Sequence, residues 1–251
     1  MDTCTAESVG KASFWSKLQS VALTVVAVML SLGQWNDAKD ALSSAYAAFV
    51  ANWTNDIEFK QISTLHVGQT QAYVTSVFGT PQASKKSKSN LDVNFFYYGH
   101  KKYQLTLAIK DERLSGYAVV GLSPDFQVSI PYTDKALLSS QIESHFSQVE
   151  TYYSDANNLE YYAESHDLGK SVMFYNLIIG AVNYGHFSHS DQSKVSDLNA
   201  ELDLGVEDVS VSLAASRQLE ANYFAITELD PQVMVEGLLT HFEYKTLLKT
   251  Q

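Results

Sequence analysis

A two-turn helix with both ends specified by side-chain chemistry is the feature of this sequence that most limits its fold. The segment Gln71–Phe78 follows Thr70, whose hydroxyl can cap a helix by accepting a bond from a first-turn amide. Gly79 can take the left-handed conformation that closes a helix, and Pro81 prevents the helix from resuming. A helix this short is not stable alone, so it must pack on another element. Its apolar face consists of Tyr73, Val74, Val77 and Phe78.

Three segments with alternating apolar residues follow this helix. The alternation predicts strands at Leu91–Tyr98, Lys102–Ile109 and Arg113–Leu122. The connections between them are short and polar, which predicts an antiparallel meander. We expect one apolar face of this sheet to receive the short helix.

The helix and the three strands together resemble a known family, the BamE/SmpA-type small outer-membrane assembly lipoproteins. Members carry a Gly-(Met)-Thr-x-x-x-Val-x-x-x-(Leu)-Gly-x-Pro signature in a domain of two helices and three strands. Gln69 replaces the usual methionine, Phe78 replaces the usual leucine, and the lipoprotein cysteine is missing. The resemblance covers residues 64–122 and implies a domain that binds other proteins, in which the glycines and the proline shape the chain. The matching positions are Gly68, Thr70, Val74, Gly79 and Pro81.

No charged residue occurs in Leu18–Asn36, and most of this segment is apolar. As a helix it would be about 28 Å long, close to the roughly 30 Å hydrocarbon thickness of a bilayer. Trp15 and Trp35 bracket it at the positions expected for interfacial indoles. We therefore predict a transmembrane helix at 18–36. A signal peptide cleaved near Ser31-Leu32-Gly33 and a buried helix are the alternatives.

The flanking charges predict how the chain is oriented. Lys11 and Lys17 precede the apolar segment, whereas only Lys39 follows it closely. Because positive residues prefer the cytoplasmic side, we expect a single-pass inner-membrane protein with the tail 1–17 inside and the large domain in the periplasm. Apolar residues then recur every three or four positions, which predicts an amphipathic stalk at 37–62. This stalk either packs on its own domain or pairs with another copy.

The remaining residues predict a mixed α+β region at 133–251. The expected fold class is therefore α+β, with a transmembrane helix and stalk, a helix plus three-stranded meander module at 63–123, and this C-terminal region. Asp230 and Pro231 suit the cap and first position of a final helix. The other expectations are a helix from Thr133, irregular structure over 152–171, a buried strand or core helix over 172–185, a polar mobile segment over 186–205, and strands at 207–215 and 222–229.

Charge and motif content exclude several function classes. Acidic residues outnumber basic ones by 28 to 17, so a phosphate backbone would be repelled and we expect no nucleic-acid partner. Cys4 is the single cysteine, so no intrachain disulfide can form. Leu168–Ser171 ends like a phosphate-binding loop, but Glu164 stands where its first glycine should be. No Gly-x-Ser-x-Gly nucleophile elbow occurs.

The histidines offer one candidate metal cluster. His186, His189 and Asp191 place three possible ligands within six residues. A zinc site needs three or four ligands that converge, and close spacing alone does not provide this geometry. We interpret these side chains as ordinary loop residues and expect no metal and no cofactor.

The preferred function is a membrane-anchored, non-enzymatic protein-binding module of the bacterial cell envelope. Tyrosine clusters in "FFYY", "TYYS" and "EYYA" are typical of contact surfaces, and they predict an unidentified protein partner; packing in the core is the alternative. Two other functions stay open. One is an enzyme with a site near His166, His186 and His189, and the other is a membrane sensor that faces the cytoplasm.

Overall fold

The structure, a computed structural model, describes residues 21, 23–26, 39 and 55–248 of the 251-residue chain. The chain divides into two units, Met1–Ile57 and Glu58–Gln251.

The first unit contains the predicted membrane segment. Residues 21 and 23–26 are helical, whereas Trp15, Trp35 and most of the predicted span lie outside the described residues. Most of the predicted stalk at 37–62 also lies outside them. In the part of the chain that the structure describes, no helix has the length and apolar composition needed to cross a bilayer. The predicted fold class included a transmembrane helix, and this part of the prediction is wrong.

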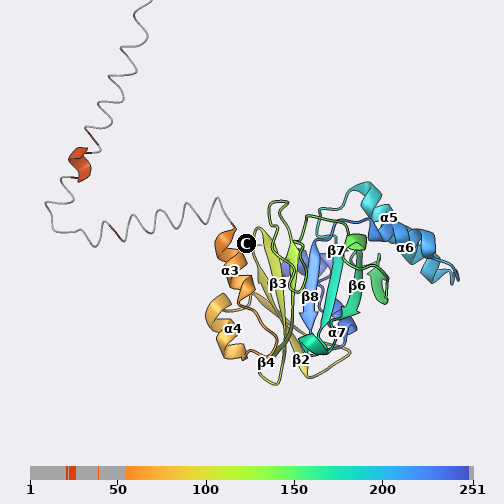
Figure 1. Cartoon of the computed structure of the whole chain (residues 1–251), viewed down its shortest axis with the longest axis horizontal. Helices are drawn as coiled ribbons and strands as arrows, with labels where there is room; N and C mark the ends of the chain where they lie inside the picture. The colour runs from red at the N-terminus through yellow and green to blue at the C-terminus, as the bar shows by residue number, and fades with distance from the viewer. Residues whose placement is uncertain (1–20, 22, 27–38, 40–54, 249–251) are drawn as a thin grey trace, which may run out of the picture. The chain divides into compact units, whose positions relative to one another are not determined.

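The second unit is built on one eight-stranded antiparallel sheet in the order β1-β2-β3-β4-β8-β7-β6-β5 (Figure 1). Strands β1 to β4 follow one another along the chain and form one half; β5 to β8 form the other. The strands are β1 (Ala83–Lys86), β2 (Val93–Gly99), β3 (Tyr103–Lys110), β4 (Arg113–Gly121), β5 (Thr151–Asp155), β6 (Tyr161–Asp167), β7 (Asn176–Val182) and β8 (Tyr223–Thr227).

The predicted module and the predicted C-terminal region share this sheet. The three predicted strands are confirmed as β2, β3 and β4, but β4 pairs on its second edge with β8. A separate module would leave that edge of β4 with unpaired backbone groups. The predicted division into a meander module and a further α+β part is therefore corrected to a single α+β fold.

Helices and loops cover both faces of the sheet, so there are two cores. The first core gathers residues such as Leu105, Val119 and Phe224 under α3, α4 and α5. The second gathers Phe95 and Tyr223 under α7 and α8. Alternate residues of β2 and β3 are buried on opposite sides, and the first of these two faces receives the short helix, as expected. The helices are α3 (Asp56–Ser63), α4 (Gln71–Phe78), α5 (His189–Asp203), α6 (Ser210–Arg217), α7 (Pro231–Glu236) and α8 (His241–Leu247), with 3₁₀ turns η1 (Ile142–Ser144) and η2 (Lys170–Val172).

The two-turn helix is confirmed as α4, with the predicted bounds. Thr70 Oγ1 accepts a bond from the Tyr73 amide at 3.3 Å, and the Gly79 amide donates to the Thr75 carbonyl at 2.8 Å with φ of 78°. Val74 is buried against the first core. Gly68, at φ of 100°, donates its amide to the Leu114 carbonyl and so ties the start of this segment to β4.

The C-terminal half differs from its prediction at several places. The segment 172–185, for which a buried strand or a core helix was expected, contains the strand β7. The strand at 222–229 is confirmed as β8, and the cap Asp230 with Pro231 as the start of α7. The predicted helix from Thr133 is wrong: only η1 forms there. The irregular segment forms β5 and β6, the polar segment forms α5, and the predicted strand at 207–215 becomes α6.

Candidate functional site

The two edge strands of the sheet differ in how they are protected. β1 carries Lys85 and Lys86, and Lys85 Nζ lies 3.3 Å from Glu243 Oε2. Lysines on an edge strand oppose pairing with another chain. β5, at the other edge, contains neither lysine nor proline, and among the described residues it pairs only with β6. Within residues 55–248, the sheet therefore has one edge protected by lysines, at β1, and one open edge, at β5.

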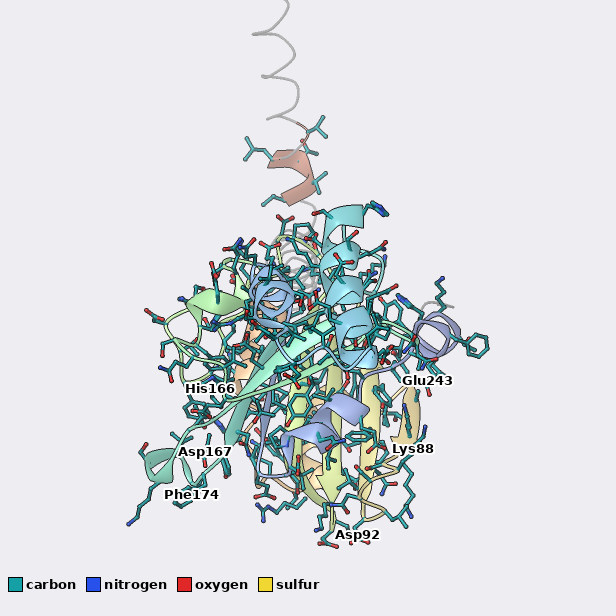
Figure 2. The ribbon with its side chains drawn as sticks, turned by 90° about the vertical axis from the view of Figure 1, so that its right-hand side faces the viewer. Lys88, Asp92, His166, Asp167, Phe174 and Glu243 are labelled. Carbon is teal, nitrogen blue, oxygen red and sulfur yellow. The ribbon has the colours of Figure 1, made fainter. Side chains whose placement is uncertain are left out.

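A groove of about 470 Å³ accompanies the open edge. Figure 2 looks onto this end of the molecule, with α5 (cyan) in the upper part and α7 below it. Tyr152 packs with the first core and Tyr153 with the second, so successive tyrosines of β5 lie on opposite faces. Tyr161 of β6, Leu202 of α5 and Val235 of α7 complete the apolar part of the groove.

The α5–α6 hairpin beside this groove exposes apolar side chains. Leu204 is 81% exposed and Val211 is 83% exposed, with Leu202 and Val206 also exposed nearby. Both helices lie at the β6 end of the sheet and pack on each other (Figure 1). Aliphatic residues grouped this way on a surface are typical of interaction sites. The sequence did not predict this exposed group, because Leu202 and Leu204 fall in the segment 186–205, predicted to be polar and mobile, and Val211 falls in the predicted strand 207–215.

Of the six tyrosines expected to form a contact surface, three are buried. Tyr97, Tyr98 and Tyr162 belong to the two cores, whereas Tyr152, Tyr153 and Tyr161 are half-buried in the groove. Burial, with smaller effects of Asp155 and Tyr153, raises the pKa of Tyr161 to about 12. Its hydroxyl is therefore neutral at pH 7 and can donate a hydrogen bond. The "TYYS" and "EYYA" clusters supply groove residues, whereas Tyr97 and Tyr98 of "FFYY" belong to the cores.

A buried ion pair lies on the first face of β6. Glu164 is fully buried, and its Oε1 lies 2.7 Å from Arg217 Nε of α6 and 2.8 Å from the Tyr162 hydroxyl, which donates to it. Arg217 also donates from Nη2 to the Phe146 carbonyl at 2.6 Å. The Glu164 carboxylate, the Arg217 guanidinium and the Tyr162 hydroxyl all have partners inside the fold. We therefore interpret the cluster as a structural contact that holds α6 against the sheet.

The histidines of the enzyme hypothesis are not brought together. His166 pairs with Leu177 near the start of β7, stacks on Phe146 and contacts Glu150. His186 follows the other end of β7, beyond Val182. At roughly 3.4 Å per residue, the length of β7 between those two points is about 17 Å. His166 and His186 cannot contact the same small substrate atom.

The carboxylate of the candidate metal cluster is engaged in a helix cap. Asp191 Oδ2 accepts from the Ser188 amide and hydroxyl, and Oδ1 lies 3.2 Å from Lys194 Nζ. These bonds lower the pKa of Asp191 against the opposing effect of burial, which is the largest single cause. His189 is the first residue of α5. His186 precedes this helix and lines a surface pocket together with Tyr244. Over the described residues, no three His, Cys, Asp or Glu side chains are grouped to hold a metal ion.

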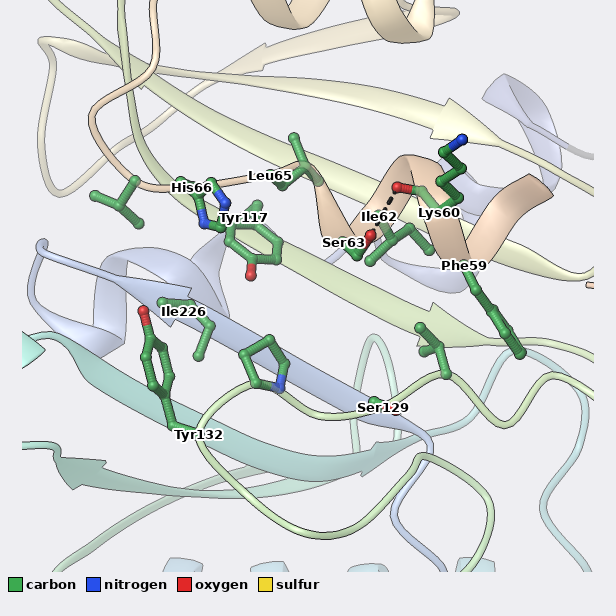
Figure 3. A pocket seen from close by; sticks show the side chains of 13 residues that line it. Phe59, Lys60, Ile62, Ser63, Leu65, His66, Tyr117, Ser129, Tyr132 and Ile226 are labelled. Atoms are coloured by element: carbon green, nitrogen blue, oxygen red, sulfur yellow. Dashed lines mark hydrogen bonds between the residues drawn. The ribbon is translucent and has the colours of Figure 1, made fainter. Parts of the chain in front are cut away.

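A second concave feature, which we call the α3 cavity, lies between α3, the segment after it and the loop 128–132. Its volume is about 570 Å³. Figure 3 shows Ile62 and Leu65 on one side, with Tyr117 and Ile226 from the sheet facing the same space. His66 and Val67, which immediately precede Gly68 of the signature, also line it. The signature segment therefore positions one wall of the cavity.

Comparisons with known proteins identify no family. No family model matches the chain, and no curated protein matches it. Two solved structures show a remote likeness. One is a cysteine-rich secretory protein from Staphylococcus aureus, with a TM-score of 0.32 and 13% identity over 64% of this chain and 44% of that one. The other is an extracellular protein with an SCP domain from Bacillus anthracis, with a TM-score of 0.34 and 12% identity over 72% and 52%.

The chain thus spans only about half the length of these two proteins. TM-scores this low support no argument about fold or function. The resemblance to the BamE/SmpA-type lipoproteins stays a prediction, which neither comparison addresses.

Proposed function

We propose that the folded unit is a non-enzymatic protein-binding domain that takes an extended segment of a partner along β5. The observation that carries this proposal is the open edge of β5 beside a tyrosine-lined groove. An extended peptide that joins a sheet edge gains main-chain hydrogen bonds, and pockets beside the edge select its side chains. The proposal has no step that requires a catalytic group.

A strand added to β5 would have side chains on both faces of the sheet, and the groove offers contacts on each face. Side chains of the partner on the first face would meet Tyr152 and α5, and those on the second face would meet Tyr153 and α7. Exposed Leu204 and Val211 extend the apolar contact beyond the strand. Tyrosines supply large contact areas at interfaces for a small loss of side-chain entropy.

The charges around this surface define the partner further. Asp203, Glu207 and Asp208 are exposed around the hairpin, and the Glu150 side chain before β5 is 58% exposed. The whole chain has a net charge of −11. A partner segment with lysine or arginine beside its apolar residues would be attracted, whereas an acidic segment would be repelled.

Site-specific photocrosslinking in cells that make the full-length protein tests this function. A benzoylphenylalanine at Tyr153 should give one defined crosslinked species. The control position is Tyr73, which is 46% exposed on α4, a helix that packs against β4 in the other half of the sheet. An absence of any product at Tyr153, or the same products at both positions, would contradict the proposal. A product of twice the protein mass would identify a second copy as the partner.

We also propose that this unit works outside the cytoplasm. The described segment 55–248 contains no cysteine, since the single one is Cys4, so an oxidising compartment would introduce no disulfide into it. Protease added to intact spheroplasts should degrade the domain while a cytoplasmic control protein survives. Protection of the domain until the cells are lysed would reject this location.

A further inference from the structure

The α3 cavity has a buried floor and an exposed mouth. Its floor is apolar: Ile62, Leu65, Val128 and Ile226 are each less than 5% exposed. Its size falls within the range of about 300–1,000 Å³ that is typical of small-molecule sites. A molecule that enters this space would bury an apolar body on side chains that are held in place by the first core.

Lys60 is the one formally charged residue among those that line the cavity. Of the 13 residues that line it, none is acidic, although the chain as a whole is strongly acidic. Lys60 and His66 are exposed lining residues, which places them at the mouth. Ser63 and Tyr132 are also exposed there and add hydroxyl groups. Figure 3 shows Ser63 and His66 along the α3 side of the space, and the Lys60 ammonium beyond Ser63, directed outward from α3.

We propose that the α3 cavity binds a free apolar carboxylate, with its apolar body on Ile62, Leu65 and Ile226 and its carboxylate at the mouth, where the exposed Lys60 side chain can turn toward it. An ammonium ion attracts a carboxylate more strongly at the rim of an apolar site than in bulk water. A cationic amphiphile would find no carboxylate in the lining to pair with. The α3 cavity and the groove at β5 share no lining residue. Ligand binding in the cavity can therefore be tested independently of the function proposed for β5.

Calorimetric titration of the full-length protein tests the charge preference directly. The probes are decanoate and decyltrimethylammonium, which have matched chains and opposite charges, both used below their micelle-forming concentrations. Decanoate should bind with one site per chain and at least ten-fold more tightly than the cation. Equal affinity for the two probes, or tighter binding of the cation, would overturn the proposal. Phosphatidylglycerol vesicles should not compete with decanoate, and competition would overturn the assignment to a free small molecule.

Two matched serine variants locate the bound probe. Ser63→Trp fills the cavity from α3, and Ser76→Trp makes the same change on α4, away from the cavity. The two serines are comparable because both are exposed and both donate to the carbonyl three residues earlier. Ser63→Trp should weaken decanoate binding at least ten-fold, whereas Ser76→Trp should leave it unchanged. Unchanged binding to Ser63→Trp would place the probe elsewhere and reject the site.

A change at Lys60 separates the charge from the shape of the cavity. Lys60→Gln keeps most of the side-chain length and removes the charge on an exposed residue, so folding should be unaffected. Affinity for decanoate should fall several-fold, while affinity for uncharged decanol should stay the same. Equal losses for both probes, or no loss for decanoate, would contradict the role given to Lys60.

Discussion

Val119 of β4 lies directly opposite Phe224 of β8, in the strand pair that joins the two halves of the sheet. Both side chains are fully buried in the first core, and the Phe224 ring packs edge-on against Tyr117 with 6.2 Å between centroids. The residues are far apart in sequence, so neither half of the sheet can complete this core alone. The two halves should therefore unfold together.

Phe224→Ala should reduce the free energy of unfolding by about 3–5 kcal/mol, because it removes a large buried side chain and leaves a cavity. Urea unfolding followed by circular dichroism measures this change, and the transition should remain single. Phe242→Ala on α8 is the control, since Phe242 is 77% exposed, and its effect should stay within about 0.5 kcal/mol. A loss of structure in only one half, seen by hydrogen exchange, would contradict the joint core.

Arg217→Met should destabilise the fold by about 3–5 kcal/mol, because it leaves the carboxylate of Glu164 buried without its cation. Glu164→Gln combined with Arg217→Met should recover part of that loss, since no charge is then left in the interior. Lys194→Met breaks the half-exposed pair with Asp191 and should cost only about 0–1 kcal/mol. The measurement is the free energy of unfolding of the wild type, Arg217→Met, the double variant and Lys194→Met. Equal effects of Arg217→Met and Lys194→Met would reject the structural role of the buried pair.

The parts of this fold that were predictable from sequence are those where local chemistry and burial agree. The bounds of α4 followed from Thr70 and Gly79, whose capping bonds involve only nearby residues. The strands β2, β3 and β4 followed from alternation and short turns. The pairing of β4 with β8 was not predictable, because it joins segments about a hundred residues apart and no local pattern specifies it.

The errors in the C-terminal half have a different cause. α5 is stabilised by a capping box between Ser188 and Asp191, a signal that was present in the sequence while the same aspartate was weighed as a metal ligand. The segment of α6 begins with alternating valine and serine, a pattern typical of a strand. It forms a helix instead, because packing against α5 stabilises the helical conformation. The open edge of β5 depends on which strand ends the sheet, so only the structure reveals this candidate site.

Acidification should weaken the fold through His145. Burial, assisted by Lys135 and opposed by Asp134, lowers the pKa of His145 from 6.5 to about 4, and its Nε2 lies 3.0 Å from the Ser140 hydroxyl. Since the unfolded chain binds this proton more readily, stability should fall as the pH drops from about 6.5 to about 4. Below that range both states are protonated and this contribution becomes constant.

Urea unfolding at pH 7, 6 and 5 measures this dependence in the wild type and in His145→Asn. The variant should lose less stability than the wild type between pH 7 and pH 5. His66→Asn alters an exposed histidine outside this contact and serves as the control. The same pH dependence in the wild type and in His145→Asn would exclude His145 as a source of acid sensitivity.

The double variant Leu204→Ser, Val211→Ser should separate binding from stability. Both side chains are more than 80% exposed, so their replacement should change the free energy of unfolding by less than about 0.5 kcal/mol. Crosslinking from a benzoylphenylalanine at Tyr153 should nevertheless fall several-fold, because the partner loses the exposed apolar surface of the α5–α6 hairpin, whose Leu202 lines the groove. Phe242→Ser, which removes an exposed apolar residue from α8, is the matched control and should leave crosslinking intact. Equal crosslinking by the double variant and the wild type would confine the contact to β5, whereas equal losses with Phe242→Ser would indicate a nonspecific dependence on surface hydrophobicity.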